Sequence, residues 1–75
     1  MIHNPARVAH KIIGGRYISL IQIDGEYELA VFTCRIVNEK PVVGTELSTT
    51  VFSNLEDAMN EYKGIVSDLK YKFDF

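Results

Sequence analysis

An apolar stripe near the C-terminal end limits the folds open to this chain. Between Ser53 and Lys70, apolar residues recur at steps of three and four, which is the spacing of one face of an α-helix. The stripe consists of Leu55, Ala58, Met59, Tyr62, Ile65, Val66 and Leu69. Ser53 and Glu56 form a capping box, so we predict a helix over residues 54–70 with Ser53 as its N-cap. A helix with such a stripe must pack on another element of the same domain.

The clearest candidate for that element is a β-hairpin in the first half of the chain. Residues 16–23 and 26–37 are rich in β-branched and aromatic residues, and Asp24-Gly25 between them suits a two-residue turn. A three-residue bulged loop would shift the register, whereas the two-residue turn makes both faces of the hairpin apolar. In that register one face carries Ile18, Leu20, Leu29 and Val31, and the other carries Tyr17, Ser19, Ile21, Ile23, Ala30 and Phe32.

Two further segments have strand composition. Val8 to Ile13 predicts a short first strand that ends at the turn Gly14-Gly15. Residues 42–52 predict a last strand, kinked or bulged at Gly44, after a polar turn over residues 38–41. The order of elements predicts an α+β fold, in which three or four antiparallel strands form a meander sheet and the C-terminal helix packs on one face.

The length of 75 residues leaves room for a single domain with a thin core. We expect residues 1–7 to be an extended or mobile lead-in, residues 8–52 to form the strands and residues 54–70 the helix. Residues 71–75 form an aromatic tail, in which aromatic and charged residues alternate with the period of a strand. The tail is therefore either a helix end that frays or an extended arm, and its aromatic rings either close the core or stay exposed.

Composition and charge bear on the cell compartment and on partners. The net charge is -2, and the eight basic residues are spread among acidic ones without a basic run, which argues against nucleic-acid binding. Cys34 is the single cysteine, so no internal disulfide forms, and a reducing cytoplasmic setting is expected. The first residues lack the apolar core of a signal peptide, and no stretch reaches the ~20 apolar residues of a membrane span. We therefore expect a soluble protein that does not enter membranes.

No pattern of residues in the sequence predicts catalytic activity. His3 and His10 are the only histidines, and neither has a partner nearby in sequence that would make it a general base. Cys34 sits in an apolar strand, where an inert thiol is usual. One cysteine and two histidines do not make a structural zinc set, and no nucleotide fingerprint is present. We therefore predict no enzyme activity, no catalytic residue, no cofactor and no metal.

The second face of the hairpin gives the functional prediction. One helix covers one face of a small sheet, so the other face stays open unless the tail or the N-terminal segment folds over it. We predict a protein interface that consists of Tyr17, Ile21, Phe32, Tyr71, Phe73 and Phe75. The chain would be a small protein-binding module, as a homodimer or as an accessory or inhibitory subunit, of the kind also found in phages and other mobile elements. The alternative is a nucleic-acid-associated protein that uses Arg16, Tyr17 and Phe32 on the sheet face.

Overall fold

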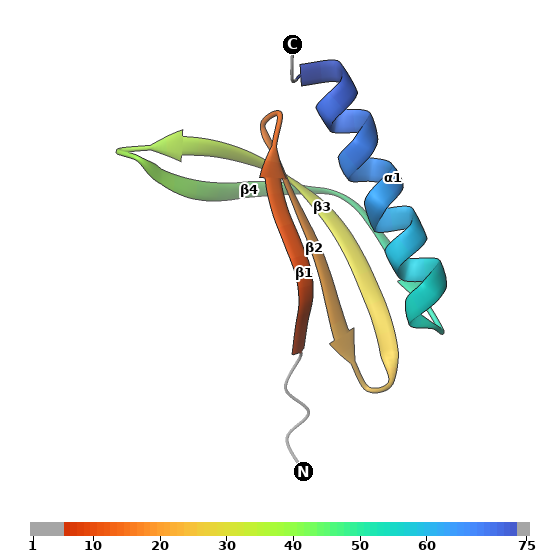
Figure 1. The fold of residues 1–75 in the computed structure, drawn as a ribbon. Coiled ribbons are helices and arrows are strands. Elements are labelled where there is room, and N and C mark those ends of the chain that lie inside the picture. Colours follow the sequence, from red (N-terminus) through yellow and green to blue (C-terminus); the bar gives the residue numbers. More distant parts are fainter. Residues whose placement is uncertain (1–5, 74–75) are drawn as a thin grey trace.

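The structure, a computed structural model, describes residues 6–73 and contains one antiparallel sheet and one helix (Figure 1). The elements are β1 (Ala6–Ile13), β2 (Arg16–Ile23), β3 (Glu26–Val37), β4 (Lys40–Phe52) and α1 (Leu55–Phe73). The strands lie in the order β1-β2-β3-β4, each antiparallel to the next. The predicted α+β fold, a four-stranded meander with a C-terminal helix, is confirmed.

Two-residue turns connect the four strands. Gly14-Gly15 and Asp24-Gly25 have positive φ at both positions, as tight hairpin turns require. Asn38-Glu39 makes the third turn with φ of 53° and 67°. The polar turn predicted over residues 38–41 is therefore too long, since Lys40 and Pro41 already belong to β4. Proline is tolerated there because β4 is an edge strand.

The register of the β2–β3 hairpin confirms the two-residue turn at Asp24-Gly25. Leu20 pairs with Leu29, and one residue further Ser19 pairs with Ala30, so the two faces are those expected from the sequence. The inner face of the sheet, which faces α1, carries Ile18 and Leu20, both with 0% of their surface exposed. These two side chains lie at the centre of the core.

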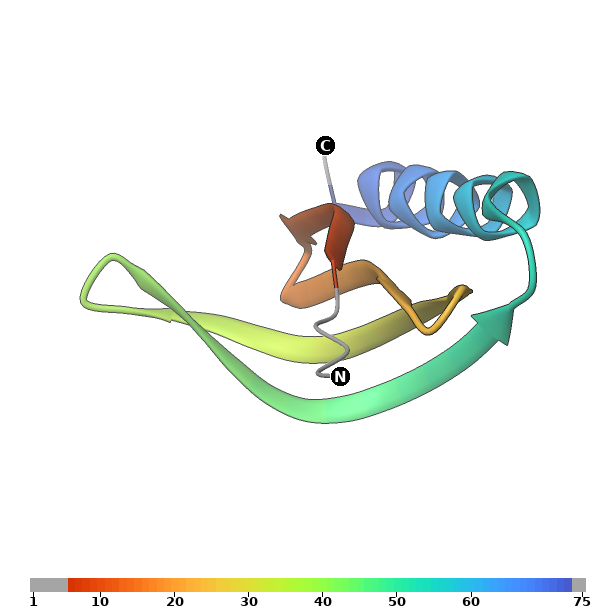
Figure 2. The same ribbon diagram turned by 90° about the horizontal axis from the view of Figure 1, so that it is seen from below.

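The helix α1 lies across the inner face of a curved sheet (Figure 2). Ala58 is fully buried there and belongs to the same core cluster as Ile18, Leu20 and Leu29. Four larger residues of the predicted stripe pack on the core while staying half-exposed: Met59, Tyr62, Ile65 and Leu69. Burial raises the pKa of the Tyr62 phenol. Leu55 is exposed at the helix start, so the stripe is buried along its middle and not over its whole length.

The N-cap of α1 is Asn54, and the prediction of Ser53 is wrong by one residue. The Asn54 Oδ1 atom accepts a hydrogen bond from the Asp57 backbone N–H at 2.8 Å, and its Nδ2 atom donates to the Asp57 carboxylate at 3.0 Å. Both Ser53 with Glu56 and Asn54 with Asp57 have the spacing of a capping pair. Asparagine caps at least as well as serine, and the side chain of Asp57 adds a second bond to it.

The ends of the described chain also differ from the prediction. The helix continues three residues past Lys70 to Phe73, so the period-two pattern of the tail does not make it a strand there. Ala6 and Arg7 pair with β2, so β1 starts two residues earlier than predicted. Phe75 and residues 1–5, including His3, lie outside the described residues.

Two β-bulges shape the far half of the β3–β4 ribbon. Between the pairs Tyr27↔Phe52 and Val37↔Lys40, β4 has two more residues than β3, and the register shifts on either side of Phe32. Bulges bend a ribbon and increase its twist. The second shift lies at Gly44, where the sequence predicted a kink or bulge. Past it, residues 34–43 leave the sheet as a two-stranded projection, called the arm from here on (Figure 1).

Candidate protein-binding surface

The face of the sheet opposite α1, called the outer face, is apolar at its centre and charged at its margins. The residues that alternate with the core residues define it. They are Arg7, His10, Ile12, Tyr17, Ser19, Ile21, Ile23, Glu26, Glu28, Ala30, Phe32, Glu46, Thr49 and Val51. Ala30 is buried between its neighbours, and the larger apolar residues of β2 and β3 are half-buried. No helix of the described chain covers this face.

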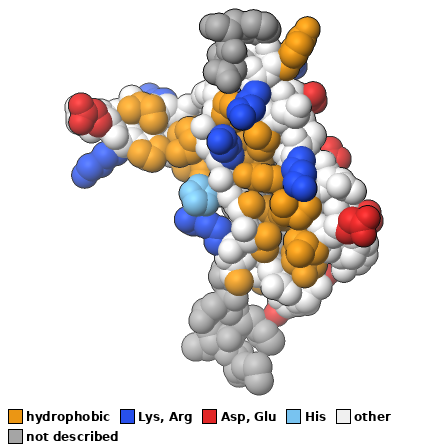
Figure 3. Space-filling model, viewed as in Figure 1, with side chains coloured by type: hydrophobic (Ala, Val, Ile, Leu, Met, Phe, Trp, Pro, Cys, Tyr) orange, Lys and Arg blue, Asp and Glu red, His pale blue; other side chains and the backbone are white. Residues whose placement is uncertain are grey.

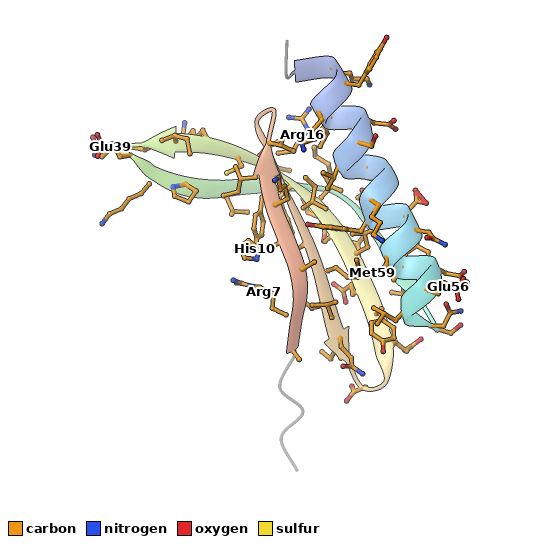
Figure 4. The ribbon with its side chains drawn as sticks, viewed as in Figure 1. Arg7, His10, Arg16, Glu39, Glu56 and Met59 are labelled. Atoms are coloured by element: carbon orange, nitrogen blue, oxygen red, sulfur yellow. The ribbon has the colours of Figure 1, made fainter. Side chains whose placement is uncertain are left out.

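Three rings form a row across the outer face. The ring centroids of His10 and Tyr17 lie 6.2 Å apart, and those of Tyr17 and Phe32 lie 6.1 Å apart. These distances are within the range of favourable aromatic contacts, which holds the rings in place on β1, β2 and β3. Figure 4 shows that Arg7 and His10 point away from α1, toward the side on which the arm projects.

The arm continues the apolar surface beyond the sheet. Cys34 pairs with Val43 and Ile36 pairs with Pro41, so all four side chains lie on the same side of the ribbon as Phe32. Ile36 has 62% of its surface exposed and Val43 has 45%. In Figure 3, hydrophobic side chains lie along the arm between its charged tip and the sheet. The outer apolar surface, as we use the term, consists of Tyr17, Ile21, Ile23, Ala30, Phe32, Cys34, Ile36, Pro41, Val43 and Val51.

Packing at the base of the arm fixes its direction. The Thr33 hydroxyl accepts a hydrogen bond from the Thr45 backbone N–H at 2.8 Å. The same hydroxyl lies over Gly44, where an added Cβ atom would stand 2.4 Å from Oγ1. The Cys34 N–H donates to the Gly15 carbonyl oxygen at 2.9 Å, which ties the arm to the β1–β2 turn. A shallow hollow at this place is lined by Thr33, Cys34, Arg35, Val42, Val43 and Gly44.

The predicted interface residues divide into two groups. Tyr17, Ile21 and Phe32 lie together on the outer face, as the register required. Tyr71 has 78% of its surface exposed, but it stands on α1, on the other side of the sheet, and so does not join them. Phe73 ends α1, and the side chain of Phe73 and all of Phe75 lie outside the described part.

The arm is the part of the surface that sequence reasoning missed. Ile36 and Val43 read as ordinary strand residues, and their exposure results from the two bulges that carry the ribbon away from the helix. The local signal for a bend in this ribbon was Gly44, a glycine within a strand-like segment, which lies at the second of the two bulges.

The chain is a small α+β domain with apolar residues exposed on the outer face and the arm. Within residues 6–73, no three metal-ligating side chains gather into a site, and no helix has the length and apolarity needed to cross a membrane. A scan against protein-family models and searches of curated proteins and of solved structures found no match.

Proposed function

We propose that this chain is a non-enzymatic protein-binding module that acts by contact and pairs with a second copy through its outer apolar surface. The observation that carries the proposal is the balance of exposed and buried apolar residues. Ten large hydrophobic side chains of the described residues are exposed, whereas three large ones, Ile18, Leu20 and Leu29, are buried. Three of the ten, Ile36, Val43 and Val51, belong to the outer apolar surface, where they adjoin the half-buried Tyr17, Ile21 and Phe32. Exposed apolar surface that is contiguous is typical of interfaces.

A thin core supports pairing on energetic grounds. Each fully buried large side chain contributes roughly 1.5–3 kcal/mol before chain entropy is subtracted. Domains of fewer than about 70–80 residues usually add disulfides, a metal or an oligomeric contact to such a core. The single cysteine excludes an internal disulfide. A second copy would bury the outer apolar surface and so extend the core of each chain.

The charges of the outer face fit a two-fold contact. Arg7 and Glu28 flank Ile21 in one row across the strands, on opposite sides of the apolar centre. A two-fold axis along the strands would reverse this row, so that Arg7 of each copy approaches Glu28 of the other. The same operation, whose axis runs over β2, would bring the Tyr17 rings of the two copies together and would lay Phe32 over Ile12 of the second copy. A specific interface buries about 1,200–2,000 Å² in total, and the arm supplies area beyond that of the sheet.

A charge placed in the ring row tests the proposal. Phe32→Glu should weaken pairing by at least about tenfold, because an interface of this kind would bury the new carboxylate without a partner. Light-scattering mass against concentration gives the dissociation constant. Ser67→Glu, which adds the same charge to an exposed position of α1, should leave the mass curve unchanged. If both variants, shown to be folded by circular dichroism, pair as the unaltered chain does, the outer face is not the interface.

The ring row also favours a second candidate, the binding of single-stranded nucleic acid. Bases stack on exposed rings, and Arg7 lies near His10 on β1, on the same face as the ring row. Glu28 and Glu46 on the same face would repel phosphates, so protein contact is the better fit. A gel shift with single-stranded RNA and DNA at low salt decides between them, since binding that weakens steeply with salt would favour nucleic acid.

A further inference from the structure

The two edges of the sheet differ in how they are protected. The edge strand β1 carries Arg7 and Lys11 and has a bulge between Arg7 and Ala9, which are devices that prevent edge pairing. The edge strand β4 has none of them over Ser48–Phe52. This segment pairs regularly with β3, contains no charged residue and no proline, and consists mostly of residues that favour strands. Among the described residues, no strand pairs with its outer edge.

The surroundings of this segment are acidic. From Pro41 to Tyr62 the chain has no lysine or arginine, and it has four acidic residues. Glu46 precedes the uncharged segment, and Glu56 and Asp57 follow it at the start of α1. The Glu46 carboxylate accepts a hydrogen bond from the Thr49 hydroxyl at 2.5 Å, which holds the charge beside the edge. The uncharged edge therefore has a negative charge at each end.

We infer that the β4 edge over Ser48–Phe52 binds an extended strand of a partner protein. The main chain of the partner would complete the ladder, as in other cases of strand addition. The properties of the β4 edge predict the sequence of the partner strand. The strand should contain about five uncharged residues rich in valine, isoleucine or threonine, and a lysine or arginine at each end to face the acidic flanks. The inference is independent of the proposed pairing through the outer apolar surface, which leaves this edge open.

A second copy fits this edge poorly. Two-fold pairing of β4 with β4 would bring the acidic segments 41–62 of both chains together, each with four negative charges and no positive one. Like charges that face each other across neighbouring strands destabilise the pair. A basic-flanked strand of another protein has no such conflict.

The test uses labelled synthetic peptides and fluorescence anisotropy with the full chain. The probe is Lys-Val-Thr-Val-Thr-Val-Lys with blocked ends, and the control has glutamate in place of both lysines. The basic peptide should bind roughly three- to tenfold more tightly than the acidic one, and the preference should shrink with added salt. In the variant Glu46→Lys the preference should fall or reverse. Equal binding of both peptides, or none, would overturn the inference.

Backbone methylation separates strand addition from simple charge attraction. Two versions of the basic peptide carry N-methyl groups at alternate residues, in one register or in the other. One version should lose binding at least about tenfold and the other should keep it, because only one edge of the added strand faces β4. If both versions bind like the parent, the contact is not a strand. If Glu56→Lys, which changes an acidic flank of the edge but leaves the outer face unaltered, instead changes the mass of the free protein, the edge belongs to a second copy and the inference is wrong.

Discussion

Replacing Leu20 with alanine should remove a large part of the stability of this protein. Leu20 has none of its surface exposed and lies between α1 and the centre of the sheet. Such a truncation costs about 2–5 kcal/mol, because the lost transfer energy adds to the cost of the cavity. A chain of this size has roughly 4–11 kcal/mol in total, at about 0.05–0.15 kcal/mol per residue. Urea unfolding followed by circular dichroism should show a much lower midpoint.

Leu55→Ala is the matched control for Leu20→Ala, because it makes the same change on an exposed residue of α1. Leu55 has 41% of its surface exposed at the start of the helix, where alanine is also a good helix former. We expect Leu55→Ala to lower the free energy of unfolding by less than about 1 kcal/mol. Equal losses in the two variants would mean that the core does not lie where α1 meets β2 and β3.

The second large effect is expected at the base of the arm, in Gly44→Ala. The new Cβ atom would stand 2.4 Å from the Thr33 Oγ1 atom, so Thr33 must move and release the Thr45 N–H. Overpacking of this kind costs about 1–3 kcal/mol. In a domain of this size, each kcal/mol lost from the free energy of unfolding lowers the melting temperature by about 4–8 °C, which thermal unfolding measures.

A double-mutant cycle with Thr33→Ala checks the cause. Removing the hydroxyl should make Gly44→Ala nearly neutral, since the next nearest atom, Thr33 Cβ, lies at an ordinary contact distance of 3.7 Å. If Gly44→Ala lowers the free energy of unfolding equally with and without Thr33→Ala, residues 33 and 44 do not interact. The arm would then owe its direction to the bulges alone.

The elements that sequence reasoning predicted well are those with a strong local signal. Asp24-Gly25 between two strand-like segments set the β2–β3 register, and with it the division of the hairpin into a core face and an outer face. The helix stripe predicted α1 and its packing on the sheet, because only one face of the helix is apolar. These signals are contained in short segments and need no knowledge of distant contacts.

The elements predicted wrongly are those where two local signals compete or where distant packing decides. Ser53 and Asn54 both offer a cap, and the second prevails because Asp57 also bonds to its side chain. Lys40 and Pro41 read as turn residues, yet a two-residue turn at Asn38-Glu39 places them in β4.

The candidate surface was predicted in its centre and missed at its edges. Tyr17, Ile21 and Phe32 follow from register alone, whereas the exposure of the arm depends on how two bulges turn the ribbon. Tyr71 was expected beside these residues, but the structure places it on α1, on the other side of the sheet. Its place beside the outer face would have required the tail to leave the helix, and α1 instead continues to Phe73.

Sedimentation equilibrium of the unaltered chain bears on the proposed function without any substitution. Pairing through the outer apolar surface predicts a mass near twice the 8.5 kDa of one chain, falling toward 8.5 kDa on dilution. Moderate added salt should weaken the pair only slightly, because apolar burial supplies most of its free energy. A mass that stays at 8.5 kDa up to about 1 mM would contradict the proposal, since a dissociation constant above that value leaves less than about 4 kcal/mol for the whole interface.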